Sequence, residues 1–197
     1  QRDKPLIGIV GNPNSGKTTL FNTLTRGKQR VGNWPGVTVE KIQGIYRDDS
    51  HALDIIDLPG IYSLSTSSVD EQVTRDFILH EKPDLIVNIV EASNLERNLY
   101  LTVQLIEMRV PVIVVLNKMD VLKQKNIKIK IDTLSRLLDV PVVCMVANRA
   151  QGIDDLRSYL HANIGEHHVS AARIYFSDEV ESAIGAITDG FSLLGMD

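Results

Sequence analysis

Short apolar runs alternate along the chain with segments that have helical periodicity. Four runs are continuously apolar, which is typical of parallel strands covered on both faces; they span residues 5–10, 84–90, 110–117 and 140–146. The amphipathic segments between them predict helices over residues 17–25, 70–80, 95–108, 133–138 and 153–164.

Two stretches early in the chain alternate apolar and polar residues instead. They cover residues 37–49 and 51–57 and predict an antiparallel hairpin that turns at residues 48–50. The whole pattern therefore predicts an α/β fold with a doubly wound, mostly parallel sheet and one antiparallel edge strand. In such a sheet the ligand is expected beyond the carboxyl ends of the strands.

The composition favours an ordinary globular domain. Hydrophobic residues make up 43% of the 197 residues, and a net charge of −4 gives no overall basic field, so no nucleic-acid partner is expected. The single cysteine, Cys144, cannot form an internal disulfide, and its apolar neighbours predict a buried small hydrophobe. No apolar run reaches the roughly 18 residues of a membrane helix, so we expect that this chain does not span a bilayer.

The pattern changes after Gly165. Residues 1–166 hold all of the alternating elements and are expected to form one domain. Residues 167–197 predict a linker and the start of a further helical domain, which we expect to be incomplete in this chain. Ser177 is the predicted helix cap, with Asp178 and Glu179 in the first turn.

The stretch GNPNSGKT, residues 11–18, follows the first predicted strand and opens a helix, which is the setting of a phosphate-binding loop. The glycines let successive backbone N–H groups face phosphates, and the helix N-terminus adds partial positive charge. Lys17 is expected to reach the β- and γ-phosphates, and Thr18 to offer its hydroxyl to Mg²⁺. The residues predicted to contact the nucleotide here are Gly11, Asn12, Pro13, Asn14, Ser15, Gly16, Lys17, Thr18 and Thr19.

The stretch NKMD, residues 117–120, ends another predicted strand at the same edge. The Asp120 carboxylate can accept both donors of guanine, a pair that adenine lacks. Asn117 is expected to bind the base and brace the phosphate loop, while the stem of Lys118 lies along the ring. The weaker pattern VANR, residues 146–149, offers a backbone N–H to the guanine carbonyl. The predicted contacts are Asn117, Lys118, Met119, Asp120, Val146, Ala147 and Asn148.

The stretch DLPG, residues 57–60, ends the second strand of the hairpin. Asp57 is expected to hold Mg²⁺ through a water molecule, and the Gly60 N–H to sense the γ-phosphate. Thr38 is the candidate for a second Mg²⁺-binding hydroxyl, next to a loop over residues 27–37 that we expect to order only around the triphosphate. The predicted contacts are Gly36, Val37, Thr38, Val39, Glu40, Asp57, Leu58, Pro59 and Gly60.

Ile61 follows Gly60 at the position where many GTP-hydrolysing switches carry a glutamine that holds the attacking water. An isoleucine side chain neither donates nor accepts a hydrogen bond. Two interpretations stay open on this residue alone: the chain hydrolyses GTP in another way, or it only binds the nucleotide.

Together these motifs resemble those of the Ras-like P-loop GTPases. The stretches RVGNWPGVTVEK, DLPGIYSL and ASNLERNLYLTVQL resemble more specifically the amino-terminal G domain of the bacterial ferrous-iron transport family FeoB, over residues 5–165. The resemblance implies a GTPase module on the cytoplasmic face of the inner membrane that gates or regulates Fe²⁺ uptake. It implies the family's transmembrane permease, absent here, as partner, and a helical domain that slows GDP release; a homo-oligomer stays open.

The resemblance also implies an answer to the question of Ile61. The family is similar to K⁺-activated GTPases, which lack the glutamine and in which a fixed cation offsets charge on the transferred phosphoryl group. Asn14 matches their side-chain ligand to K⁺, and backbone carbonyls around Gly32 and Trp34 would complete the shell. A slow, K⁺-stimulated GTPase is therefore expected, with a catalytic set of Asn14, Lys17, Thr38 and Gly60.

Two other functions are weighed on the sequence. A soluble GTPase of ribosome assembly or tRNA modification usually carries a basic RNA-binding appendage, which this acidic chain does not show. A non-hydrolysing GTP-binding module would explain Ile61.

Three further features carry weaker expectations. Trp34 is either a partner contact or an exposed ring. The lysines of residues 123–130 predict a solvated segment, and His167 and His168 predict a linker rather than a metal site.

Overall fold

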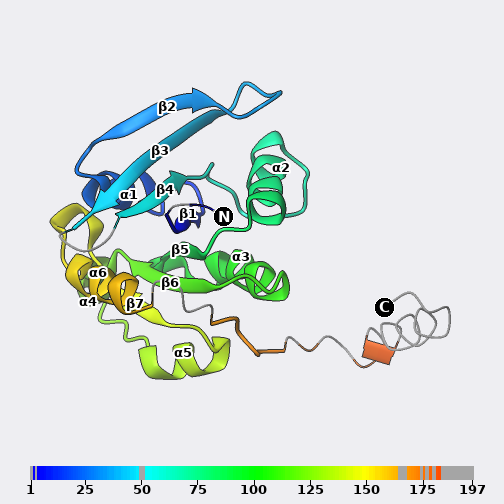
Figure 1. The fold of residues 1–197 in the computed structure, drawn as a ribbon. Coiled ribbons are helices and arrows are strands. Elements are labelled where there is room, and N and C mark those ends of the chain that lie inside the picture. The colour runs from blue at the N-terminus through cyan, green and yellow to red at the C-terminus, as the bar shows by residue number, and fades with distance from the viewer. Residues whose placement is uncertain are drawn as a thin grey trace.

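The computed structural model describes residues 2, 4–48, 52–163, 168–173, 175, 178, 181 and 182. Seven strands form one mixed sheet in the order β2-β3-β4-β1-β5-β6-β7 (Figure 1). The strands are β1 (Leu6–Gly11), β2 (Gln29–Asn33), β3 (Glu40–Arg47), β4 (Ala52–Asp57), β5 (Leu85–Glu91), β6 (Val112–Asn117) and β7 (Val142–Cys144). The helices are α1 (Lys17–Thr25), α2 (Val69–Asp76), α3 (Leu95–Glu107), α4 (Met119–Gln124), α5 (Ile131–Leu138) and α6 (Ile153–Ala162).

Parallel pairing joins five of the strands. β1 pairs with β4 and β5, and β6 pairs with β5 and β7. β3 pairs with β4 in antiparallel order, and β2 pairs with β3 in the same way, so these two strands form a ribbon at one edge of the sheet (Figure 1). The predicted fold class is confirmed, and its antiparallel edge is two strands wide.

Hydrophobic cores pack on both faces of the sheet. In β1, Leu6 and Val10 belong to one core, whereas Ile7 and Ile9 belong to the other. Helices α2 and α3 contribute to the first core, and helices α1 and α6 to the second. Apolar residues on both faces of the strand explain its continuously apolar sequence, and the covered faces leave the strand ends for a ligand.

Three elements differ from the sequence prediction. The loop expected over residues 27–37 contains β2, which the apolar pattern could not reveal because all five of its residues are exposed. The short helix α4 occupies part of the segment expected to be only a connection. Strand β7 has three residues, and Cys144 is half-buried rather than buried. Burial, with a smaller contribution from Asp155, raises the pKa of the Cys144 thiol, which keeps it a poor nucleophile.

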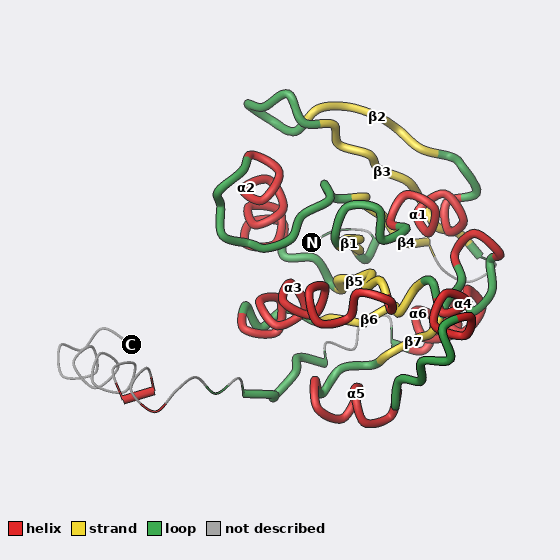
Figure 2. The backbone as a smooth tube through the Cα atoms, turned by 180° about the vertical axis from the view of Figure 1, so that it is seen from behind, coloured by secondary structure: helices red, strands yellow, loops and turns green. Residues whose placement is uncertain are grey.

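Residues 168–173 lie against the corner formed by the ends of α3 and α5 (Figure 2). The Arg109 side chain donates to the Ser170 carbonyl at 2.8 Å, and Ser170 Oγ donates to the Leu138 carbonyl at 2.7 Å. Ser170 is 2% exposed, so this part of the linker is fixed to the domain. The domain boundary at residue 166, the turn residues Asp49 and Ser50, the predicted cap Ser177 and His167 all lie outside the described residues.

We expect Gly44→Ala to destabilise the domain by about 1–3 kcal/mol, because the extra carbon over-packs the contact between β3 and α1. A Cβ on Gly44 would lie 2.4 Å from Thr25 Cγ2 and 2.9 Å from Phe21 Cζ. Gly32→Ala is the matched control, since a Cβ there meets no heavy atom within 4 Å. Urea unfolding should lower the midpoint of the first variant only; equal midpoints would contradict the packing described.

Candidate functional site

Four of the predicted motifs meet at the carboxyl ends of the parallel strands. The phosphate loop joins β1 to α1, and the DLPG, NKMD and VANR stretches follow β4, β6 and β7. Because these strands run parallel in one sheet, their ends lie along the same edge (Figure 1). The fold thus brings together segments as distant in sequence as Ser15 and Asn117, which are 102 residues apart and hydrogen-bonded.

The Asn117 side chain joins the phosphate loop to the loop after β7. Its Nδ2 donates to the Ser15 carbonyl at 2.7 Å, and its Oδ1 accepts the Ala147 N–H at 2.9 Å. Asn117 is 3% exposed, so both bonds are shielded from water. Gly16 permits this contact: its φ is 105°, and an added Cβ would lie 2.2 Å from Asn117 Nδ2. This geometry fits the expected role of Asn117, which is to hold the phosphate loop and the loop after β7 together.

Thr18 and Asp57 form an oxygen-rich pair below the phosphate loop. Thr18 Oγ1 donates to Asp57 Oδ2 at 3.0 Å. Asp57 is buried, and its Oδ1 has no hydrogen-bond partner among the described residues. Burial raises the pKa of the Asp57 carboxyl, and Lys17 and the Thr18 hydrogen bond oppose the change. A hydroxyl and an unsatisfied carboxylate oxygen are hard ligands, so these residues fit Mg²⁺.

Lys17 is buried beside this pair, with 9% of its surface exposed. Burial lowers the pKa of its ammonium group, and the Asp57 and Asp70 carboxylates oppose the shift. Its Nζ lies 3.2 Å from the position of a Cβ added to Gly60, so the lysine reaches the DLPG stretch. A desolvated cation at the start of a helix suits a polyanion such as a triphosphate.

A cavity of about 270 Å³ collects several of the predicted residues. Thr38 is exposed and does not line it, although its neighbours do. Asp70, in the first turn of α2, lines the cavity and was missed because no motif marks it. The lining residues are Lys17, Thr18, Val39, Glu40, Ile42, Asp57, Leu58, Pro59, Gly60 and Asp70.

The base-binding stretch has a partner that sequence reasoning missed. Lys118 Nζ contacts Glu91 Oε2 at 3.0 Å, and Ser93 Oγ donates to Glu91 Oε1 at 2.8 Å. Although burial acts to raise it, the hydrogen bonds from Lys118 and Ser93 hold the pKa of the Glu91 carboxyl below its usual value. Glu91 is the last residue of β5, so it fixes the lysine next to the half-buried Asp120 at the start of α4.

The VANR stretch is only partly available to a base. The Ala147 N–H, one of two predicted contacts to the guanine carbonyl, is already donated to Asn117 Oδ1. Asn148 is exposed, and its N–H is therefore the better candidate. Ala147 itself is 8% exposed and belongs to the core that contains α1 and α6.

Ile61 lies in the core rather than at the phosphates. Its side chain is 2% exposed and packs in the cluster that includes residues of α2 and α3. Its N–H donates to the Gly11 carbonyl at 3.2 Å. The Ile61 side chain therefore packs in the core and offers no polar group to an attacking water.

Trp34 is not an exposed ring. It is 8% exposed and packs edge-on against Phe77, with 5.8 Å between the ring centroids. Lys41 Nζ lies 4.6 Å from the centroid of its ring. Gly32 is paired with Lys41 in the β2–β3 ribbon, whereas Asn14 is exposed at the phosphate loop with φ 63°.

Other sequence features carry no site in the described part of the chain. The lysines of residues 123–130 are exposed, as predicted for a solvated segment. His168 Nε2 lies 3.0 Å from the Asp139 carbonyl, and no group of three or more His, Cys, Asp or Glu residues suited to a metal occurs among the described residues. None of the described helices combines the length and apolar character needed to cross a bilayer.

The fold and these loops define a P-loop GTP-binding domain of the Ras-like class. Residues 6–160 match the model of the family described as ferrous iron transport protein B, and the chain belongs to this family. The resemblance to FeoB is thereby confirmed.

Individual relatives agree with this assignment. The Fe(2+) transporter FeoB of Escherichia coli K12 is 52% identical over 158 residues, which cover 78% of this chain and 20% of that protein. The chain thus spans about a fifth of the length of the curated relatives it matches. A GDP-bound variant of the S. thermophilus FeoB G domain is 45% identical, with a TM-score of 0.85 over 95% of this chain and 72% of that one. The cytosolic domain of the T. maritima iron transporter in a GDP form is 35% identical, with a TM-score of 0.88 over 96% and 75%.

We expect Asn117→Ala to cost about 2–4 kcal/mol of stability, because it leaves the Ser15 carbonyl and the Ala147 N–H buried without partners. Affinity for GDP should fall at least tenfold, since both loops lose their common support. Asn22→Ala, on the exposed side of α1, is the control and should change neither property. Urea unfolding and titration with fluorescent GDP measure the two effects; parental GDP affinity in the Asn117 variant would refute the bracing role.

We expect Asp57→Asn to stabilise the nucleotide-free protein at neutral pH and to weaken its binding of Mg²⁺·GTP. An acid whose folded pKa is raised binds its proton more tightly in the folded state, so ionised Asp57 costs stability above that pKa and the cost vanishes as pH falls below it. Tm should rise by a few degrees at pH 7.5, at about 2–4 °C per kcal/mol, and the gain should shrink toward pH 4. The exposed Asp132→Asn control should show neither change; a gain independent of pH would contradict the assignment.

Proposed function

We propose that this chain is the GTPase module of a ferrous-iron transporter, and that it binds Mg²⁺·GTP and hydrolyses it to GDP and phosphate. The observation that carries the proposal is one cavity lined by Lys17, Thr18, Asp57 and Gly60, with Thr18 hydrogen-bonded to Asp57. These are the group types that P-loop GTPases direct at phosphates and Mg²⁺. Family membership and the GDP named for related G domains support the proposal.

In the proposed complex, the phosphate loop binds through its backbone N–H groups and through Lys17. Thr18 and Asp57 would hold Mg²⁺, which neutralises charge on the β- and γ-phosphate oxygens when bound. Asp120 accepts the two donors of guanine, and the Asn117 brace sets the distance between the base and the phosphates. The Gly60 N–H would bind the γ-phosphate.

Hydrolysis transfers the γ-phosphoryl group to water. The water oxygen bonds to the γ-phosphorus, the bond to the bridging oxygen breaks, and its electron pair leaves with GDP, while the proton of the water passes to the phosphate. Ile61 cannot orient this water because its side chain is buried in the core. We infer that backbone groups near Gly60 and Thr38 hold the water and that turnover is slow.

We propose K⁺ as activator, with Asn14 as its side-chain ligand. Asn14 is exposed and stands in the left-handed region at φ 63°, which leaves its amide open to an ion. Backbone carbonyls around Gly32 and Trp34 would complete the shell. A fixed positive charge there would offset charge developing on the transferred group.

The relatives support a role in transport. They are Fe(2+) transporters, five times longer than the matched region, so we propose that a permease outside this chain is its partner at the cytoplasmic face of the inner membrane. We also propose that residues 167–197 begin a helical domain that slows GDP release. The family match argues against a GTPase of ribosome assembly or tRNA modification.

A non-hydrolysing module remains the second candidate, because the buried Ile61 leaves no side chain for the water. We expect this chain to hydrolyse GTP several-fold faster in KCl than in NaCl at equal ionic strength, and Asn14→Ala to remove the difference without abolishing nucleotide binding. Asn22→Ala serves as the matched control. Phosphate release under steady-state conditions is the measurement. Turnover that ignores the cation would remove K⁺ from the proposal, and no turnover in either salt would favour the binding module.

A further inference from the structure

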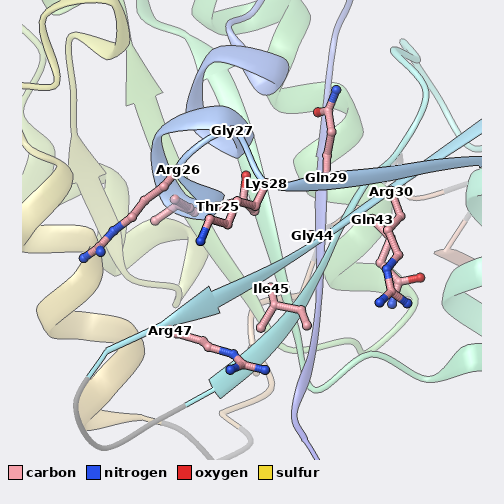
Figure 3. Close-up of a pocket in the computed structure, with 11 residues that line it drawn as sticks. Thr25, Arg26, Gly27, Lys28, Gln29, Arg30, Gln43, Gly44, Ile45 and Arg47 are labelled. Carbon is pink, nitrogen blue, oxygen red and sulfur yellow. The ribbon is translucent and has the colours of Figure 1, made fainter.

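A second cavity, of about 720 Å³, lies at the opposite end of α1 from the phosphate loop. It opens between the C-terminal end of α1 and the outer ribbon of β2 and β3 (Figure 3). Helix α1 has nine residues, which places the two sites about 13 Å apart along its axis. We call this feature the basic cavity, because its lining includes Arg26, Lys28, Arg30 and Arg47.

The charges of the basic cavity are not compensated. None of the described residues that line it is Asp or Glu. None of its four cations forms an ion pair or a side-chain hydrogen bond with another residue in the described part of the chain. This is unexpected in a chain with 25 acidic and 21 basic residues, where a neighbouring carboxylate is easily supplied. Mutual repulsion of the cations is relieved when an anion binds between them.

The shape of the cavity suits a phosphate group with an organic substituent. Lys28, Arg30 and Arg47 come from the turn after α1 and from both strands of the ribbon, and Figure 3 shows them spread around Ile45, with Arg26 pointing away. Leu24 and Ile45 add an apolar surface, while the exposed Gly27 keeps backbone accessible. Guanidinium groups bind phosphate oxygens in pairs, and a lysine adds a point charge.

We propose that the basic cavity is a second anion site, which binds a phosphate-bearing ligand independently of the nucleotide site. Two sources carry this chemistry: the headgroup of an acidic phospholipid and a free phosphate. The lipid source rests on the proposed place of the module beside a membrane, where basic residues near the surface attract anionic headgroups. The phosphate site itself does not depend on the proposed GTPase activity.

The test uses the chain saturated with Mg²⁺·GDP, so that the phosphate loop is occupied. Co-sedimentation with vesicles of phosphatidylglycerol and phosphatidylcholine measures binding to an acidic lipid headgroup, and vesicles of pure phosphatidylcholine are the blank. Changes in the NMR chemical shifts of the Gly27 and Gly44 amides during titration with inorganic phosphate measure binding of the free anion. The variant K28Q/R30Q/R47Q replaces three exposed cations and should weaken binding on the order of 100-fold.

The control variant K123Q/K128Q/K130Q removes the same charge from exposed lysines elsewhere and should bind as the parent does. Vesicle binding lost only in the cavity variant assigns the lipid source, and shifts with phosphate alone assign the free anion. Equal loss in both variants, or no response to either probe, overturns the proposal. GTP hydrolysis measured in parallel separates the two proposals, because vesicle binding without turnover would support the cavity and refute the enzyme.

Discussion

The hydrogen bonds of the Asn117 side chain are the constraint on which the nucleotide site depends. One buried carboxamide holds the Ser15 carbonyl and the Ala147 N–H at once, so the phosphate loop and the base loop cannot move independently. The contact is possible only because residue 16 is a glycine with φ 105°. Because a buried amide is costly to leave unpaired, the brace keeps the distance between phosphates and base fixed before any ligand arrives.

Around this brace, two charged groups are buried at a cost in free energy that a bound nucleotide would reduce. Burial lowers the pKa of Lys17 and raises that of Asp57, so it disfavours the charged form of each residue. The attraction between the two opposite charges partly offsets this effect. Asp57 Oδ1 has no partner among the described residues. A triphosphate and Mg²⁺ would supply charges opposite to those of Lys17 and Asp57, which would offset the cost of burying these ions. The site is therefore built for a ligand and not for maximal stability.

The sequence was sufficient to predict those elements whose structure is determined by their own residues. The phosphate loop, the parallel strands and most helices were predicted because each depends on its own residues. Strand β2 was not, since QRVGN buries no side chain and is held by backbone pairing alone. The burial of Trp34 against Phe77 and the pairing of Lys118 with Glu91 were missed because they depend on neighbours from other elements. Asp70 reaches the cavity only through the placement of α2.

The burial of Trp34 sets the energy of any switch in this region. Any rearrangement that moves the Trp34 side chain breaks the contact of its indole with Phe77, which directly follows α2. Exposing an apolar side chain of this size costs at least about 2 kcal/mol. A ligand shifts such an equilibrium only by its differential affinity for the two states. A triphosphate that drives such a rearrangement would therefore have to bind the rearranged state at least about 30-fold more tightly than the present one. Since Phe77 directly follows α2, this one aromatic contact links the segment between β2 and β3 to the C-terminal end of α2.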